Sequence, residues 1–262
     1  MPTGQSSRSE RGGKSSGSPA HRSAAAAGSQ QALRRWEKGV AIALFLLLAL
    51  IAVQSGRLGA SALYAQMAQM ELDRWGSSRI PGAVSGLRRA EGHLSDSLRM
   101  VSGNPWALEK AGAAQLARMR TTIDPREALA AARNARSRYR DALLQRPASP
   151  FLWANLALTK LYLDQFDEEM FTALRHADEL GPWEPAVQQT VLFVGLAAWD
   201  RLDPGLQQGL ARTLERGALR NAPKMYEIVK SYRRYDLLCG IKKYNDMREL
   251  DCKRAGDPVP VR

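Results

Sequence analysis

The chain has 262 residues, of which 45% are hydrophobic and 24% charged, and its formal net charge is +12. This length allows one core-forming domain of roughly two hundred residues beside smaller segments. The charge is uneven, because residues 1–38 carry seven basic residues and only two acidic ones. Rich in Ser, Gly and Ala, this arm has the composition of a disordered tail, since little in it could form a core.

A run of uncharged, almost wholly apolar residues begins at Gly39 and ends at Val53. The whole uncharged stretch, residues 39–56, would span roughly 27 Å as a helix, which is close to the thickness of a bilayer core. We therefore expect a transmembrane anchor over residues 39–56. A cleaved signal peptide is the alternative, since Ala60-Ser61-Ala62 has the small-x-small form of a cleavage site. The length of the basic arm favours the retained anchor.

Basic residues flank this run unevenly, with seven before it and only Arg57 between it and Arg74. By the positive-inside rule the arm is expected in the cytoplasm and the rest of the chain in the periplasm, on a bacterial inner membrane. Export argues against nucleic acid as a partner. It leaves anionic lipid headgroups, acidic polysaccharide or an acidic protein, and a basic surface that is simply solvated is the plainer alternative.

The rest of the chain has helical periodicity and no stretch with the alternation of a β-strand, which predicts an all-α protein. A juxtamembrane helix is expected over 58–75 and a second helix over 86–101. Asn104-Pro105 and Asp124-Pro125 predict the next two helix starts, because each combines a good N-cap with a proline tolerated at the first helical position.

Prolines expected at helix starts recur at unequal intervals of 45, 35 and 38 residues, at Pro105, Pro150, Pro185 and Pro223. Each interval holds two amphipathic helices and a turn, the pattern of helical hairpins that bury their faces by stacking. The segment from Trp153 matches the Trp-x-x-Leu-(Gly/Ala) opening of a tetratricopeptide repeat, although Lys160 stands where that motif has Tyr. Gly181 is expected to end one helix in a left-handed cap.

These patterns predict a tetratricopeptide-like helical-hairpin domain over residues 86–238. A juxtamembrane helix and linker, residues 57–85, joins it to the anchor, and a tail of residues 239–262 follows it. This tail contains the two cysteines of the chain, Cys239 and Cys252. In an oxidising compartment they are expected to pair, which would stabilise the tail by about 3 kcal/mol in the chain-entropy model. Two free buried thiols are the alternative, and a metal pair is a poor one because no His lies nearby.

Several blocks in the middle of the chain resemble the VpsP family of polysaccharide-biosynthesis proteins: Phe151–Leu161, Phe166-Asp167, Ala173–Arg175, Leu180–Gln188 and Leu196–Leu202. The resemblance covers roughly residues 85–240. It implies a small bacterial protein with one N-terminal span and a repeat-like helical body, encoded with exopolysaccharide assembly machinery. Because the shared motifs are structural, the resemblance implies a pathway and assigns no reaction.

No catalytic motif stands out in the sequence. It contains no HExxH, no GxSxG and no Gly-rich phosphate loop, and His21, His93 and His176 each stand alone. Asp167-Glu168-Glu169 is interpreted as the acidic first turn of a helix, since consecutive helical positions point in different directions. We therefore expect no enzyme, no cofactor and no metal, while two distant carboxylates meeting across a cleft would revive an enzyme.

Two concentrations of basic residues are candidate contacts for an anionic partner, although a solvated face explains each more simply. Arg133, Arg136 and Arg140 form the first, on one face of a helix, and Lys230, Arg233 and Arg234 form the second, beside Lys242 and Lys243. Four aromatic residues are expected to fill the space between hairpins rather than stack on sugars, namely Trp153, Tyr162, Trp183 and Trp199.

Together these features indicate a membrane-anchored helical-repeat scaffold or accessory subunit in bacterial exopolysaccharide biosynthesis or export. It would act by binding protein subunits of an envelope polysaccharide machine, and possible acidic-polysaccharide contacts would use the basic surface. An assembly factor of a pilus or secretion system is the first alternative, and a polysaccharide-modifying enzyme is the second.

Overall fold

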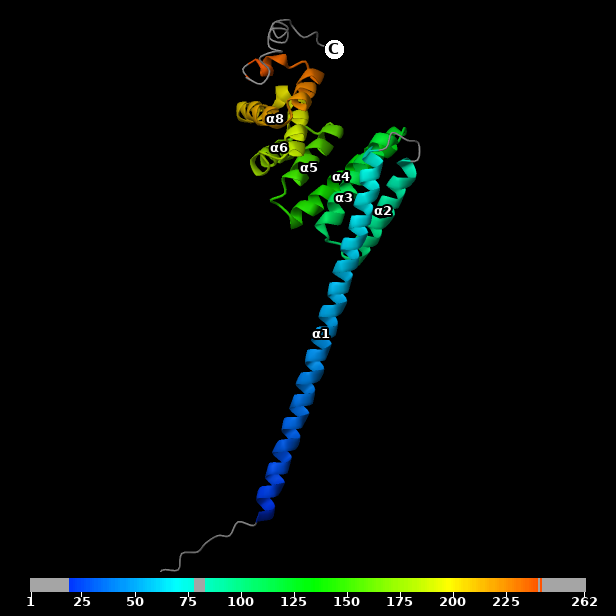
Figure 1. Ribbon diagram of the computed structural model, residues 1–262, viewed down its shortest axis with the longest axis vertical. Coiled ribbons are helices and arrows are strands. Elements are labelled where there is room, and N and C mark those ends of the chain that lie inside the picture. The colour runs from blue at the N-terminus through cyan, green and yellow to red at the C-terminus, as the bar shows by residue number, and fades with distance from the viewer. Residues whose placement is uncertain (1–18, 78–82, 240, 242–262) are drawn as a thin grey trace, which may run out of the picture. The chain divides into compact units, whose positions relative to one another are not determined.

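The computed structural model describes residues 19–77, 83–239 and 241, and every regular element in them is helical. This confirms the all-α prediction. By its internal contacts the chain divides into two units, Met1–Gly56 and Arg57–Arg262. The elements, labelled in Figure 1 where there is room, are α1 (Pro19–Ser77), α2 (Ala83–Met100), α3 (Pro105–Thr121), α4 (Pro125–Gln145), α5 (Pro150–Tyr162), α6 (Glu168–Leu180), α7 (Pro185–Ala197), η1 (Trp199–Arg201), α8 (Pro204–Ser231) and η2 (Tyr235–Leu238).

The apolar run lies within α1. In the described part of the chain, the segment Trp36–Arg74 of this helix is long and apolar enough to cross a membrane. Large apolar side chains from Val40 to Val53 are exposed, as lipid-facing residues would be, whereas a helix on a soluble domain would bury one face. The anchor prediction therefore has a matching helix.

The arm differs from the prediction, because α1 begins at Pro19. Residues 19–38, expected to be disordered, have helical backbone. The run Ala24–Ala27 consists of the strongest helix former, and extending an existing helix avoids the cost of nucleating a new one. The composition of the arm does not show that it is continuous with the apolar helix, and for this reason the prediction missed its helical backbone. Residues 1–18 lie outside the described residues.

After Arg57, α1 packs into the helical unit as the predicted juxtamembrane helix. Ser61 is fully buried, and its hydroxyl lies 2.9 Å from that of Ser97 in α2. The side-chain amide of Asn104 donates to the Ser61 hydroxyl at 2.7 Å. The same asparagine caps α3, so one buried polar cluster joins three elements.

Helix starts are local features, and the structure confirms four that the sequence predicted, at Pro105, Pro125, Pro150 and Pro185. Four of the described helices also have a side-chain N-cap. Each cap side chain accepts a hydrogen bond from a backbone N–H two or three residues later, which satisfies a donor that the helix leaves unpaired. These caps are Asn104, Asp124, Asp167 and Asp203.

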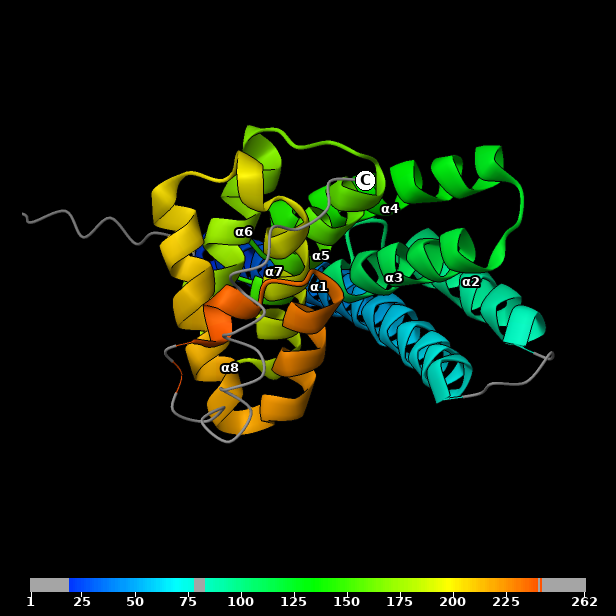
Figure 2. The ribbon, with the colours of Figure 1, turned by 90° about the horizontal axis from the view of Figure 1, so that it is seen from above.

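Beyond α2, the helices pack in sequential pairs, α3 with α4, α5 with α6 and α7 with α8. Neighbouring pairs touch through α4 with α5 and α5 with α7, and α2 packs on α3 (Figure 2). One core runs through these pairs from Leu108 to Leu210, and another joins α7 to α8 and η2 around Met225. A third connects Ala65 and Ala68 of α1 to α2 and α3.

Two backbone details differ from the prediction. Gly181 has φ −129°, so the left-handed cap is wrong. Glycine is needed there for space instead, since a Cβ would lie 2.6 Å from Cβ of Pro150. The helix expected to begin at Pro223 is the second half of α8, which kinks at Asn221 with φ −145° and ψ 64°. Asn221 accepts from the backbone N–H of Lys224 at 3.3 Å and so recaps the helix.

The aromatic prediction holds for two of its four residues. Trp153 and Trp199 pack against the main core, and Trp153 also donates to the Pro147 carbonyl at 2.7 Å. Trp183 is 52% exposed and Tyr162 is 37% exposed, so neither is a core residue. Both stand beside turns, where the stacking of helices ends.

Candidate functional site: a polar groove along α2, α3 and α4

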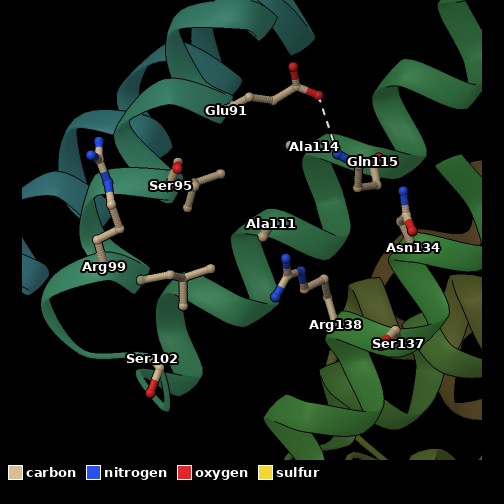
Figure 3. Close-up of a pocket in the computed structure, with 12 residues that line it drawn as sticks. Glu91, Ser95, Arg99, Ser102, Ala111, Ala114, Gln115, Asn134, Ser137 and Arg138 are labelled. Carbon is tan, nitrogen blue, oxygen red and sulfur yellow. Dashed lines mark hydrogen bonds between the residues drawn. The ribbon is translucent and has the colours of Figure 1, made fainter.

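A groove of about 610 Å³ follows α2, α3 and α4 (Figure 3). Because α3 packs between the other two helices, it forms the middle of the groove and they form its sides. The lining residues recur three or four positions apart on each helix, so each helix contributes one face. The lining is Glu91, Leu94, Ser95, Leu98 and Arg99 from α2, Ser102 from the following turn, Ala111, Ala114 and Gln115 from α3, and Asn134, Ser137 and Arg138 from α4.

The floor of the groove is apolar. Leu94 and Ala114 are buried, and Leu98 and Ala111 are partly buried against the same cores. The two alanines of α3, Ala111 and Ala114, have small side chains and so fill little of the space between α2 and α4. The space above these two alanines forms part of the groove.

The acidic group of the groove, Glu91, is already neutralised. Arg118 donates to its carboxylate from Nε at 2.9 Å and from Nη2 at 2.5 Å, and Gln115 donates to it at 3.3 Å (Figure 3). On the same helix, Arg99 is paired with Asp96 one turn away. Neither charge is therefore fully available to a ligand.

The α4 side differs in this respect. Asn134, Ser137 and Arg138 are exposed, and within the described residues their side chains form no hydrogen bond or ion pair. Figure 3 shows Arg138 extending from α4 toward Ala111 of α3. A guanidinium with five donors and no intramolecular acceptor is suited to bind an external carboxylate.

The predicted arginine stripe lies on a different face of α4. Arg140 donates two hydrogen bonds to Glu169 of α6 at 2.6 and 2.5 Å, and Arg136 donates to Gln165 at 2.7 Å. These two residues tie α4 to the α5–α6 pair. Arg133 is exposed and has no such contact among the described residues. Contact between the stripe and an anionic partner stays a prediction.

The second predicted basic group surrounds the end of α8. Lys230 lies 5.9 Å from the centre of the Tyr226 ring, and Arg233 is exposed with φ 55°. Arg234 stacks 4.0 Å from the centre of the Trp199 ring and pairs with Asp236 at 2.6 Å. Arg234 is thus mainly a packing residue. Lys242 and Lys243 lie outside the described residues.

The pairing of the two cysteines stays a prediction, because Cys252 also lies outside the described residues. Peptide mapping tests it directly. Non-reducing peptide mapping of the exported protein is expected to find Cys239 linked to Cys252. Blocking free thiols before lysis prevents exchange during preparation. Two alkylated cysteines in the mature protein would contradict the staple.

A buried lysine is the feature that sequence reasoning missed. Lys160 is only 1% exposed, and its Nζ lies 2.8 Å from the Asp167 carboxylate and in direct contact with that of Glu169. Hydrogen bonds from Arg140, and then from Lys160, lower the pKa of Glu169 to about 2. Lys160 of α5 therefore forms ion pairs with the acidic residues at the start of α6. The turn between the two helices contains Asp164, whose φ is 54°. The sequence did contain one signal of this unusual lysine, because Lys160 stands where the tetratricopeptide motif has Tyr.

This pKa shift predicts an acid-sensitive fold. Because the pKa of Glu169 is about 2 in the folded chain and near 4.5 when unfolded, its ionisation stabilises the fold above about pH 4.5. That contribution is lost as the pH falls toward 2. The thermal midpoint of the detergent-solubilised chain should drop across this window, and the drop should be smaller in Glu169→Gln. Glu168→Gln, at the exposed neighbouring position, is the control, and equal profiles for the two variants would contradict the assignment.

Comparison of the chain with protein-family models, with curated proteins and with solved structures finds no match. The function is therefore argued from the fold and the groove. Among the described residues, no group of three His, Cys, Asp or Glu side chains could hold a metal ion.

Proposed function

We propose that this protein is a membrane-anchored helical scaffold that binds a protein subunit of an envelope machine. The observation that carries the proposal is the combination, in one chain, of a helix suited to a bilayer with stacked helical pairs that leave a groove open. An anchor confines its domain to the membrane surface, and stacked helices offer an extended binding surface. Binding is thus the activity that this architecture serves best.

The pathway proposed is bacterial exopolysaccharide biosynthesis or export, and the domain is proposed to be tetratricopeptide-like. Resemblance to the VpsP family supports the pathway, and sequential helix pairing supports the repeat class. The chain would lie in the inner membrane with its N-terminus cytoplasmic and its helical domain periplasmic, as the charge flanking the span supports.

The retained anchor is preferred to a cleaved signal peptide. Ser61, at the centre of the small-x-small motif, is buried inside α1 and bonded to Ser97 and Asn104. Cleavage beside it would cut a packed helix and remove a member of the buried polar cluster.

Crosslinking in living cells, followed by purification of the detergent-solubilised native protein and mass spectrometry, tests the function. Polysaccharide polymerase, chain-length or export subunits are the expected partners. Recovery of pilus or secretion subunits would favour the alternative assembly-factor role. Absence of any envelope protein from the crosslinked material would refute the scaffold.

Topology is tested separately with reporters. A reporter that works only in the periplasm, fused after Arg262, is expected to be active, and one that works only in the cytoplasm is expected to be silent. The opposite pair of results would reverse the orientation. Fusion of the same reporters before the apolar run controls for expression.

The groove gives little support to an enzyme. A glycosidase of the common type needs two carboxyl groups facing each other across the substrate. Glu91 is the acid that lines this groove, and Arg118 holds it.

A further inference from the structure

Resting on the proposed scaffold function, we infer that the α2–α3–α4 groove binds an extended acidic peptide segment of the partner, with Arg138 as its main carboxylate contact. The inference names the chemistry of the ligand, which the scaffold role alone leaves open. It follows from the charge, the floor and the side-chain composition of the groove.

The charge of the groove favours an acidic ligand. Five arginines and only two acids occur in α4, and Arg138 is the one that lines the groove. Arg99 lies on the opposite side, from α2 (Figure 3), and the carboxylate of Glu91 is compensated by Arg118. Since Asp96 already pairs with Arg99, the groove offers one guanidinium without a partner among the described residues, that of Arg138, and no free carboxylate among its lining residues. An incoming carboxylate would gain charge-assisted hydrogen bonds there.

The floor favours a peptide. In an extended chain successive side chains point in opposite directions, so alternate apolar residues could rest on Leu98 and Ala111, the partly exposed apolar lining residues, while acidic ones stay near the rim. Asn134, Ser137 and Ser102 supply donors and acceptors that could meet the backbone of such a segment. An apolar floor with a polar rim is the usual composition of a protein-binding surface.

The composition argues against a saccharide. No aromatic residue lines the groove, so the apolar faces of sugar rings would have no ring to stack on. The exposed aromatic residues Tyr162 and Trp183 belong to the later helical pairs and are not among the lining residues. An acidic polysaccharide would thus have only the guanidinium contacts, and it is the competing outcome of the test.

The test uses the full-length chain in detergent micelles and a short fluorescein-labelled peptide in which Glu and Leu alternate. A matched peptide with Gln in place of Glu measures the contribution of charge, and oligogalacturonate is the saccharide competitor. Fluorescence anisotropy gives Kd for the intact chain, for Arg138→Glu and for the groove-filling Ser137→Trp. Arg133→Glu is the control, because it makes the same charge change at an exposed position of α4 that is not among the lining residues of the groove. All three substituted positions are exposed, so thermal unfolding should be unchanged.

The Glu-Leu peptide is expected to bind at least about tenfold more tightly than the Gln-Leu peptide. Arg138→Glu and Ser137→Trp should each weaken it by about tenfold or more, and Arg133→Glu should change Kd by less than about threefold. Equal losses in Arg138→Glu and Arg133→Glu would reduce the effect to net charge and overturn the inference. Preference for the Gln-Leu peptide, no binding of either peptide, or tighter binding of oligogalacturonate would overturn it as well.

Failure of the inference is distinguishable from failure of the scaffold. Envelope subunits captured by crosslinking, together with no peptide binding, would keep the scaffold and remove the groove as its acidic-peptide site. Peptide binding that depends on Arg138, with no envelope protein captured in cells, would keep the site and remove the proposed function.

Discussion

Replacing Asp167 and Glu169 together by Asn and Gln is expected to lower the free energy of unfolding by about 3–5 kcal/mol, the range for stranding a buried charge. Both substitutions keep the size of the side chain, and Asn at 167 can still cap α6. What they remove is the negative charge beside Lys160, which is only 1% exposed. The lysine would then stay buried without a compensating carboxylate. Chemical denaturation followed by circular dichroism measures the loss.

The matched variant is Lys160→Met, which is expected to cost less than the double substitution. Methionine has a similar length and no charge to bury, while the two carboxylates it leaves behind are partly solvated, with side-chain exposures of 52% for Asp167 and 33% for Glu169. Glu169 also keeps its two hydrogen bonds from Arg140. The two variants are expected to differ in stability because the lysine is the most deeply buried charged group of this cluster. A larger loss in Lys160→Met than in the double variant would show that packing of the lysine stem, and not the buried charge, holds α5 against α6.

This cluster also shows how far the sequence could go. The sequence placed Asp167-Glu168-Glu169 in the first turn of a helix. The structure confirms this for Glu168 and Glu169 and has Asp167 as the N-cap just before them; such a start is predictable because capping depends on residues two or three positions apart. Burial of Lys160 depends on how the turn around Asp164 folds α6 back on α5, and no local pattern encodes that path. Helix starts at Pro105, Pro125 and Pro150 were predictable because they depend on neighbouring residues alone, whereas this burial depends on the packing of two helices.

The groove illustrates the same limit. Arg138 is one of five arginines in α4, and the periodic spacing of Arg133, Arg136 and Arg140 drew attention to a different face. Two of those three are occupied by contacts with Gln165 and Glu169. Whether an arginine has a partner, and whether it lines a groove, is decided by the neighbouring helices, so the place of Arg138 could be recognised only in the fold.

The second large effect is expected at Gly112, where α3 meets α4. A Cβ added there would lie 2.7 Å from Cε1 and Cζ of Tyr139, whose ring is almost fully buried. Gly112→Ala should therefore destabilise the chain by about 1–3 kcal/mol through overpacking, even though alanine favours a helix. Gly92→Ala in α2 is the matched control. A Cβ at Gly92 meets nothing within 4 Å, so that variant should gain about 0.4–1 kcal/mol from the smaller entropy of its unfolded chain.

The consequence of Gly112→Ala should extend beyond stability, because the same close approach of α3 and α4 sets the width of the groove. Relief of the overlap requires either a shift of the Tyr139 ring or a separation of the two helices. If the helices separate, Arg138 moves away from the apolar floor, and the Glu-Leu peptide should bind more weakly even at temperatures where the variant is fully folded. Combining Gly112→Ala with Tyr139→Leu supplies room in the core, so the two substitutions should cost less together than the sum of their separate costs. The double variant should also bind the Glu-Leu peptide more tightly than Gly112→Ala alone does. Additive losses in the double variant would mean that Tyr139 is not the residue that limits the approach of the two helices.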